Sequence, residues 1–124
     1  MSVLDFYNAT REKFPEITKK ADIKHIEMWD EVDPEFAYSW FESLANALNS
    51  EMVSGTDAIK YKALFAYIGA NFSEGDNEVK NCIDVSFTEN LFWKIPAANA
   101  KPYWETLPLN LRELYINFHG KEPL

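Results

Sequence analysis

The side chains that most often do chemistry in proteins are sparse in this sequence and form no known motif. His25 and His119 are the two histidines, and neither has a second metal ligand at helical spacing. Cys82, the one cysteine, lies in an apolar helical pattern that is typical of a buried structural thiol. The four glycines are isolated, so no Walker-type or dinucleotide-type phosphate loop can be built from them. The sequence therefore predicts no catalytic residue, no metal site and no cofactor.

Asp84 is the best remaining candidate for acid–base chemistry. It stands between two apolar stripes, so we expect it to be partly buried, with Asn81 and Thr88 on the same polar strip. A buried aspartate of this kind is usually a structural cap or bridge. A small enzyme or ligand-binding domain with a polar pocket around Asp84 stays open as an alternative, as does a Cys82–histidine pair formed in space.

Charge and composition restrict the classes of partner. The chain has 20 acidic and 12 basic side chains and a formal net charge of −8, which repels nucleic acid and acidic membrane surfaces. A basic protein partner is favoured, although acidity can also serve only to keep a protein soluble. We find neither a signal peptide nor an apolar run long enough to span a bilayer, so the expected location is the cytoplasm.

An acidic segment with an aromatic residue is the clearest candidate for a binding surface. Residues 27–35 hold five carboxylates in nine positions, with a tryptophan among them. Dense acids beside an aromatic ring suit a basic protein surface, because they speed association. The alternative is a solvated loop whose tryptophan packs inward. The predicted partner-binding residues are Trp29, Asp30, Glu31, Asp33, Glu35 and Glu42.

Apolar residues recur at helical spacing along most of the chain, and this predicts an all-α fold. We expect an irregular bundle of five or six helices in a single domain, residues 1–124. The expected helical segments are 2–14, 15–28, 33–50, 56–72, 76–93 and 108–119, with a turn or two at 100–106. Within 76–93, residues 82–87 also alternate as a strand would, but the helical pattern continues through Trp93.

The segment 33–50 has the strongest helical pattern. Asp33 suits the N-cap and Pro34 the first turn, and an apolar stripe begins at Phe36 and runs through Trp40 to Leu48. In the segment 15–28 the apolar residues are Ile17, Ile23 and Ile26. The residues expected to be buried together in the core are Trp40, Leu44, Leu64, Ile68, Ile83 and Phe87.

Two stretches, Asn81–Leu91 and Leu107–Tyr115, resemble a family of small helical bacterial proteins without assigned activity. Some members of that family resemble immunity proteins, which are encoded beside toxins of contact-dependent growth inhibition or related polymorphic toxin systems. The resemblance implies a protein that binds and neutralises a cognate toxin domain, and the negative charge favours a basic, nuclease-type toxin. A non-catalytic adaptor subunit is a further alternative.

Overall fold

The computed structural model describes all 124 residues, and every regular element in it is helical. The predicted all-α class is confirmed, but the chain forms seven α-helices and not five or six. Part of the difference is α6, which was expected to be a turn or two and runs for 10 residues with Pro102 inside it. The elements are α1 (Val3–Lys13), α2 (Pro15–Trp29), η1 (Pro34–Phe36), α3 (Ala37–Val53), η2 (Ala58–Tyr61), α4 (Lys62–Glu74), α5 (Asn77–Cys82), η3 (Ile83–Thr88), α6 (Ala97–Thr106) and α7 (Leu109–His119).

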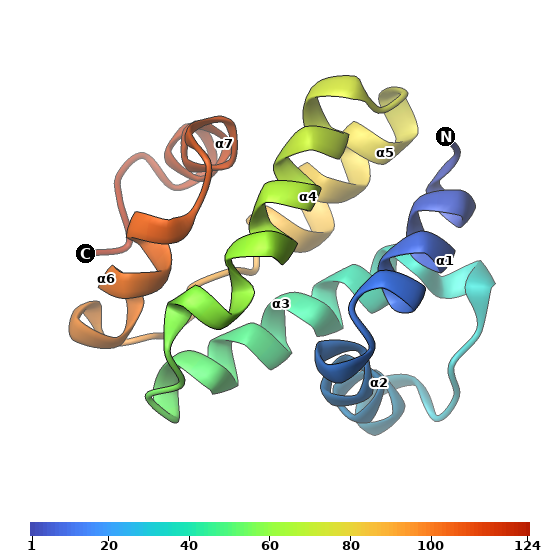
Figure 1. Ribbon diagram of the computed structural model, residues 1–124, viewed down its shortest axis with the longest axis horizontal. Coiled ribbons are helices and arrows are strands. Elements are labelled where there is room, and N and C mark those ends of the chain that lie inside the picture. The colour runs from blue at the N-terminus through green and yellow to red at the C-terminus, as the bar shows by residue number, and fades with distance from the viewer.

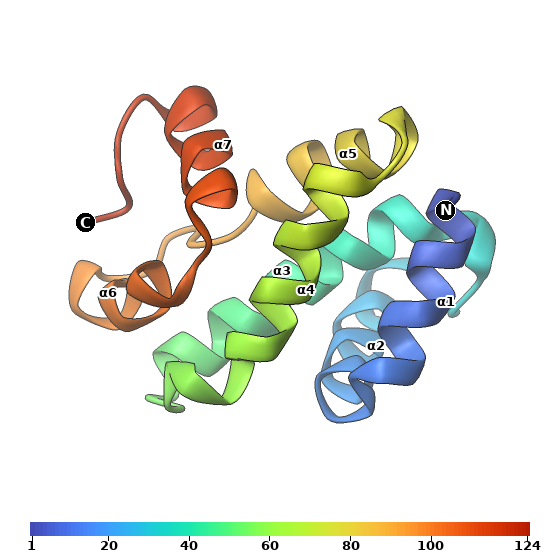
Figure 2. The same cartoon turned by 45° about the horizontal axis from the view of Figure 1, so that its top comes forward.

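The long helix α3 is the centre of the bundle (Figure 1). The α1–α2 pair packs against one end of α3, the π-helix η3 packs against α3, α4 lies beside α5, and α6 and α7 lie at the other end. The two ends of the chain consequently lie at opposite ends of the molecule (Figure 2). None of the helices combines the length and the apolar run that a membrane span needs.

One apolar cluster fills the space between these helices. All six residues expected in the core are buried and belong to this cluster, so that prediction is confirmed. Within the cluster, aromatic rings join α1 to α3: Phe6 stacks on Phe41 with 4.6 Å between ring centroids, and Tyr7 meets Trp40 edge-on at 5.3 Å. Such paired rings add stabilisation beyond their buried area.

Asp22 joins the first three helices. Its carboxylate accepts two hydrogen bonds from the Arg11 guanidinium, at 2.5 and 2.9 Å, and a third from Trp40 Nε1 at 2.8 Å. These three donors leave the half-buried carboxylate well satisfied. The position of α2 is therefore fixed by polar bonds as well as by packing.

A second carboxylate, Glu51, joins α2 and α3 to η2. It is buried, and it accepts hydrogen bonds from Lys20 Nζ at 2.5 Å and from the Tyr61 hydroxyl. Burial alone would raise the pKa of Glu51, but the two hydrogen bonds and the charge of Lys20 outweigh it, so the pKa lies below its ordinary value. Glu51 is therefore held in its charged form.

Two of the predicted helices begin later than expected. The Asp33 side chain accepts from the backbone N–H of Glu35 at 2.8 Å and caps the 3-10 turn η1, so α3 starts at Ala37. Phe36, which was expected on the buried stripe, is 38% exposed as a result. Asp57 likewise caps the 3-10 turn η2 through the N–H of Ile59, before α4.

The predicted helix 76–93 is also corrected. The strand alternative for residues 82–87 is wrong. The segment is helical, but α5 passes into the π-helix η3, and regular structure stops at Thr88 rather than at residue 93. The backbone bond from Glu89 N to Asp84 O, at 3.1 Å, has the five-residue span of a π-turn. Phe92 then adopts a positive φ of 68°, which ends the helical path before Trp93, and Lys94 after it has a φ of 55°.

Candidate docking surface

Helix α2 exposes large apolar residues on its outer side. Its inward face carries Ile17, Thr18, Ala21 and His25, and Ala21 allows close approach to α3. Ile17 is buried, whereas Ile23 and Ile26, the other two isoleucines of the helix, are 59% and 46% exposed. Exposed apolar residues gathered on one surface mark interaction sites more often than isolated ones do.

This apolar surface continues past the end of α2 through a pair of rings. Trp29 is 44% exposed, so the alternative in which it packs inward is wrong. It stacks on Phe36, with 6.2 Å between the ring centroids and 14° between the planes. Phe36 was expected on the buried stripe of segment 33–50, and the 3-10 turn η1 ahead of α3 exposes it. We call Ile23, Ile26, Trp29 and Phe36, together with Asp30, Glu31, Asp33 and Glu35, the acidic–aromatic face.

The acidic residues of this face occupy different local structures. Asp30 ends α2 in the left-handed conformation, with φ of 68°, and its N–H donates to Ile26 O. Asp33 is half-buried and caps η1, whereas Glu31 and Glu35 are exposed. The structure thus gathers these predicted residues in one turn. Glu42 is half-buried on α3, and no side-chain hydrogen bond or ion pair connects it to the turn.

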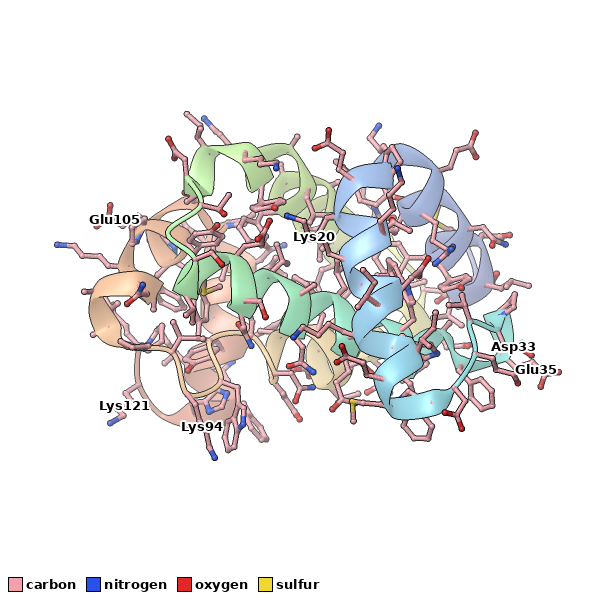
Figure 3. The ribbon with its side chains drawn as sticks, turned by 90° about the horizontal axis from the view of Figure 1, so that it is seen from below. Lys20, Asp33, Glu35, Lys94, Glu105 and Lys121 are labelled. Atoms are coloured by element: carbon pink, nitrogen blue, oxygen red, sulfur yellow. The ribbon has the colours of Figure 1, made fainter.

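The carboxylates of the acidic–aromatic face have no cationic partner within the chain. The ion pairs of the structure are Arg11–Asp22, Lys20–Glu51 and Lys60–Glu16. The last turn of α2 also has no basic residue that would offset these acids. Acids beside a helix C-terminus oppose the helix dipole, so they lower the stability of the folded protein. Because they have no ion-pair partner in the chain, these carboxylates are available to external cations. Figure 3 shows Asp33 and Glu35 at one end of the molecule.

The polar strip around Asp84 does not form a shared pocket with its expected neighbours. Burial raises the pKa of the half-buried Asp84 carboxyl. Asn81 is exposed and donates to the Tyr38 hydroxyl at 3.3 Å, while Thr88 is buried with no partner for its hydroxyl. None of the surface hollows of about 260–350 Å³ is lined by Asn81, Asp84 or Thr88.

Cys82 and the two histidines have separate surroundings. Cys82 is fully buried, and burial raises the pKa of its thiol to about 12. His25 is also fully buried, with its Nδ1 at 3.5 Å from Ser43 Oγ, and His119 bonds the carbonyl of Glu89. Neither histidine pairs with Cys82. No group of three or more histidine, cysteine or acidic side chains is placed to hold a metal ion.

The protein is thus an all-helical chain with an exposed apolar surface beside carboxylates that have no ion-pair partner. Over residues 7–120 the sequence matches the family described as a domain of unknown function, DUF7674, and the chain belongs to that family. Comparison with curated proteins and comparison with solved structures gave no match.

Proposed function

We propose that this protein is an immunity protein, which binds a cognate basic toxin domain of the nuclease type and covers its active site. The observation that carries the proposal is the acidic–aromatic face. Here the exposed Trp29–Phe36 pair lies beside carboxylates without internal partners. The resemblance of residues 81–91 and 107–115 to a family of small helical bacterial proteins, some of which resemble immunity proteins, supports the same function.

The two halves of the face serve different steps of binding. A nuclease holds phosphates with cationic groups, and the carboxylates of Asp30, Glu31 and Glu35 would lie over those groups. Exposed charge pairs mainly speed association, since desolvation offsets much of their contribution to affinity. Tryptophan is among the residues that most often dominate interface energies. Trp29 is therefore expected to slow dissociation.

The proposal is tested with the toxin domain encoded beside the gene for this protein. In the test variant Asp30, Glu31 and Glu35 are changed to lysine; in the control, Glu12, Glu105 and Glu113, which are exposed elsewhere, are changed to lysine. Both triples change the net charge by the same amount. We expect cells with the control variant to survive the toxin and cells with the test variant to lose protection.

Trp29→Ala separates the aromatic contribution from the charge. It should raise the dissociation rate by about tenfold or more, in line with loss of a central interface tryptophan, and should change the association rate little. If the neighbouring gene encodes no toxin that this protein binds, or if both triples protect equally, the proposal is wrong.

A further inference from the structure

The four tryptophans of the chain differ in whether a cation covers the indole ring. For three of them a cationic group lies 5.5 to 5.7 Å from a ring centroid, and the pairs are Trp40 with Arg11, Trp93 with Lys94 and Trp104 with Arg112. Trp29 has no cation of the chain over its ring. Because the face of an aromatic ring attracts cations, Trp29 retains a binding capacity that the other three tryptophans already use.

The surroundings of Trp29 combine accessible ring surface with negative charge. The side chain is 44% exposed, and its ring is nearly parallel to that of Phe36. Asp30 follows Trp29 in the sequence and Glu35 precedes Phe36, so each ring has an exposed acidic residue beside it in the chain. Neither acid forms an ion pair with a cation of the chain. A partner's cation over the Trp29 ring therefore also meets unpaired carboxylates.

The surroundings of Arg11 show which cation combines aromatic rings with a carboxylate. Its guanidinium lies 5.2 Å from the Tyr7 ring centroid and 5.5 Å from a Trp40 ring centroid. The same group donates to both carboxylate oxygens of Asp22, at 2.5 and 2.9 Å. A guanidinium can make both contacts at once, because its flat face stacks on a ring while its edge presents paired N–H donors.

Lys60 makes the corresponding contacts less well. Its ammonium lies 5.8 Å from the Tyr61 ring centroid and 3.8 Å from the Glu16 carboxylate, which is too far for a hydrogen bond. An ammonium is a compact point charge without a flat face, so a ring and a carboxylate compete for it. Between the two basic side chains, arginine is therefore the better match to a ring beside carboxylates.

We propose that the acidic–aromatic face binds an arginine side chain of the partner, with the guanidinium over the Trp29 ring and its N–H donors on the carboxylates of Asp30 and Glu35. This inference rests on the proposed toxin-binding function and specifies the group that the face recognises. Arginine pairs with phosphate through the same two parallel N–H donors that pair with a carboxylate. The surface with which a nuclease holds phosphates therefore offers groups of this kind.

The first experiment uses the full chain without a toxin. The isotope-labelled protein is titrated with blocked tripeptides of arginine, of lysine and of citrulline, which has nearly the shape of arginine without the charge. The indole N–H signal of Trp29 is followed by NMR. We expect the arginine peptide to give a saturable shift and to bind about fivefold or more tightly than either other peptide. Equal binding of the arginine and lysine peptides would contradict the assignment.

Trp93 is the internal control in this titration. It is 61% exposed, but Lys94 already lies over its ring. Lys94 and Glu35 lie at opposite ends of the molecule (Figure 3), so the two tryptophans report on separate surfaces. The Trp93 signal should shift little with the arginine peptide. Shifts of the same size at Trp29 and Trp93 would mean that any exposed indole attracts the peptide, and the proposal would be wrong.

Variants separate the ring from the charge, with binding followed through the backbone signals of residues 30–36. Trp29→Leu keeps an apolar side chain without a ring and should weaken binding of the arginine peptide about threefold or more, whereas Trp29→Tyr should retain most of it. Equal binding by these two variants would exclude a contact with the ring face.

Asp30→Asn together with Glu35→Gln removes both charges, and asparagine tolerates the positive φ at position 30. This pair should weaken binding of the arginine peptide about threefold or more. The matched control is Glu12→Gln with Glu113→Gln, two exposed acids elsewhere. Equal losses in the two pairs would show that only net charge attracts the peptide, which contradicts the assignment.

The toxin domain encoded beside the gene then identifies the arginine. Each surface arginine of the toxin is changed to lysine, and dissociation constants are measured with the wild type and with Trp29→Leu. At one arginine we expect a loss of about tenfold that becomes much smaller in the Trp29→Leu background. If the toxin binds but no arginine is coupled to Trp29, the arginine assignment fails while the proposed function stands. If no toxin binds but the peptide preference holds, only the proposed function fails.

Discussion

Trp29 and Phe36 form a near-parallel ring pair across the turn that follows α2, with 6.2 Å between the centroids and 14° between the planes, and both rings are exposed. A stacked pair has a fixed orientation, so little side-chain freedom remains to be lost when a partner covers it. Beside the ring pair, Asp30 ends α2 and Asp33 caps η1, and both residues also contribute charge to the surface. The same residues therefore shape the turn and present its acidic surface.

Replacing Asp30 with glycine should stabilise the protein. Asp30 caps α2 with φ of 68°, a conformation that glycine adopts without steric cost. The backbone bond to Ile26 O is retained, so the gain should be about 0.5–1 kcal/mol. Urea unfolding measures it, with Glu31→Gly as the matched control. An Asp30→Gly protein that is no more stable than the control would contradict the strained cap.

Truncation of the two tryptophans should have unequal effects on stability. Trp40 is fully buried and donates to Asp22, so Trp40→Ala should cost about 3–5 kcal/mol through lost burial and a cavity. Trp29 is exposed, and Trp29→Ala should cost less than about 1 kcal/mol. Chemical denaturation of the two variants checks this order, and similar losses would mean that Trp29 belongs to the core.

The Glu51 network should make stability depend on pH in the acid range. Hydrogen bonds from Lys20 and Tyr61 hold the pKa of Glu51 below its ordinary value of 4.5. A carboxylate whose pKa is lower in the folded state stabilises the fold above its unfolded pKa and loses that contribution as pH falls through the folded pKa.

Unfolding free energies of the wild type and Glu51→Gln, measured from pH 7 down to pH 3, test this point. The difference between the two proteins should be largest near neutral pH and shrink below the unfolded pKa. A difference that does not change with pH would mean that the charge of Glu51 contributes nothing.

Cys82 should be inert toward thiol reagents while the protein is folded. The side chain is fully buried and its pKa is raised to about 12, so almost no thiolate exists at neutral pH. Reaction with a colorimetric disulfide reagent should appear only on addition of denaturant. Rapid reaction of the native protein would show that the α5–η3 region opens readily.

Helical periodicity could predict the core but not the exposed surfaces. Trp40 and Leu44 follow a regular stripe on a helix that packs on several sides, so spacing alone identifies them as buried. Ile23 and Ile26 are apolar and yet exposed, because the inward face of α2 carries Ala21 and His25. Which face of a helix turns inward depends on tertiary contacts that spacing does not contain.

The irregular turns escaped prediction for local reasons. Asp33 was identified as a capping residue from the sequence. A capping residue does not determine whether the turn that follows is a 3-10 turn or an α turn, and the 3-10 turn at this position leaves Phe36 exposed. The π-turn at Ile83–Thr88 and the positive φ of Phe92 carry no periodic signal. The acidic cluster could be predicted as a surface, because its carboxylates lie close together in the sequence.

The most direct test of the proposed toxin-binding function is the association rate constant between this protein and its cognate toxin domain, measured by stopped flow at increasing salt. We expect that changing Asp30, Glu31 and Glu35 to lysine slows association about tenfold or more at low salt and weakens its salt dependence. The triple lysine change at Glu12, Glu105 and Glu113 should leave most of the rate and its salt dependence intact. Equal rate constants for the two variants at every salt concentration would show that the acidic–aromatic face does not guide the partner.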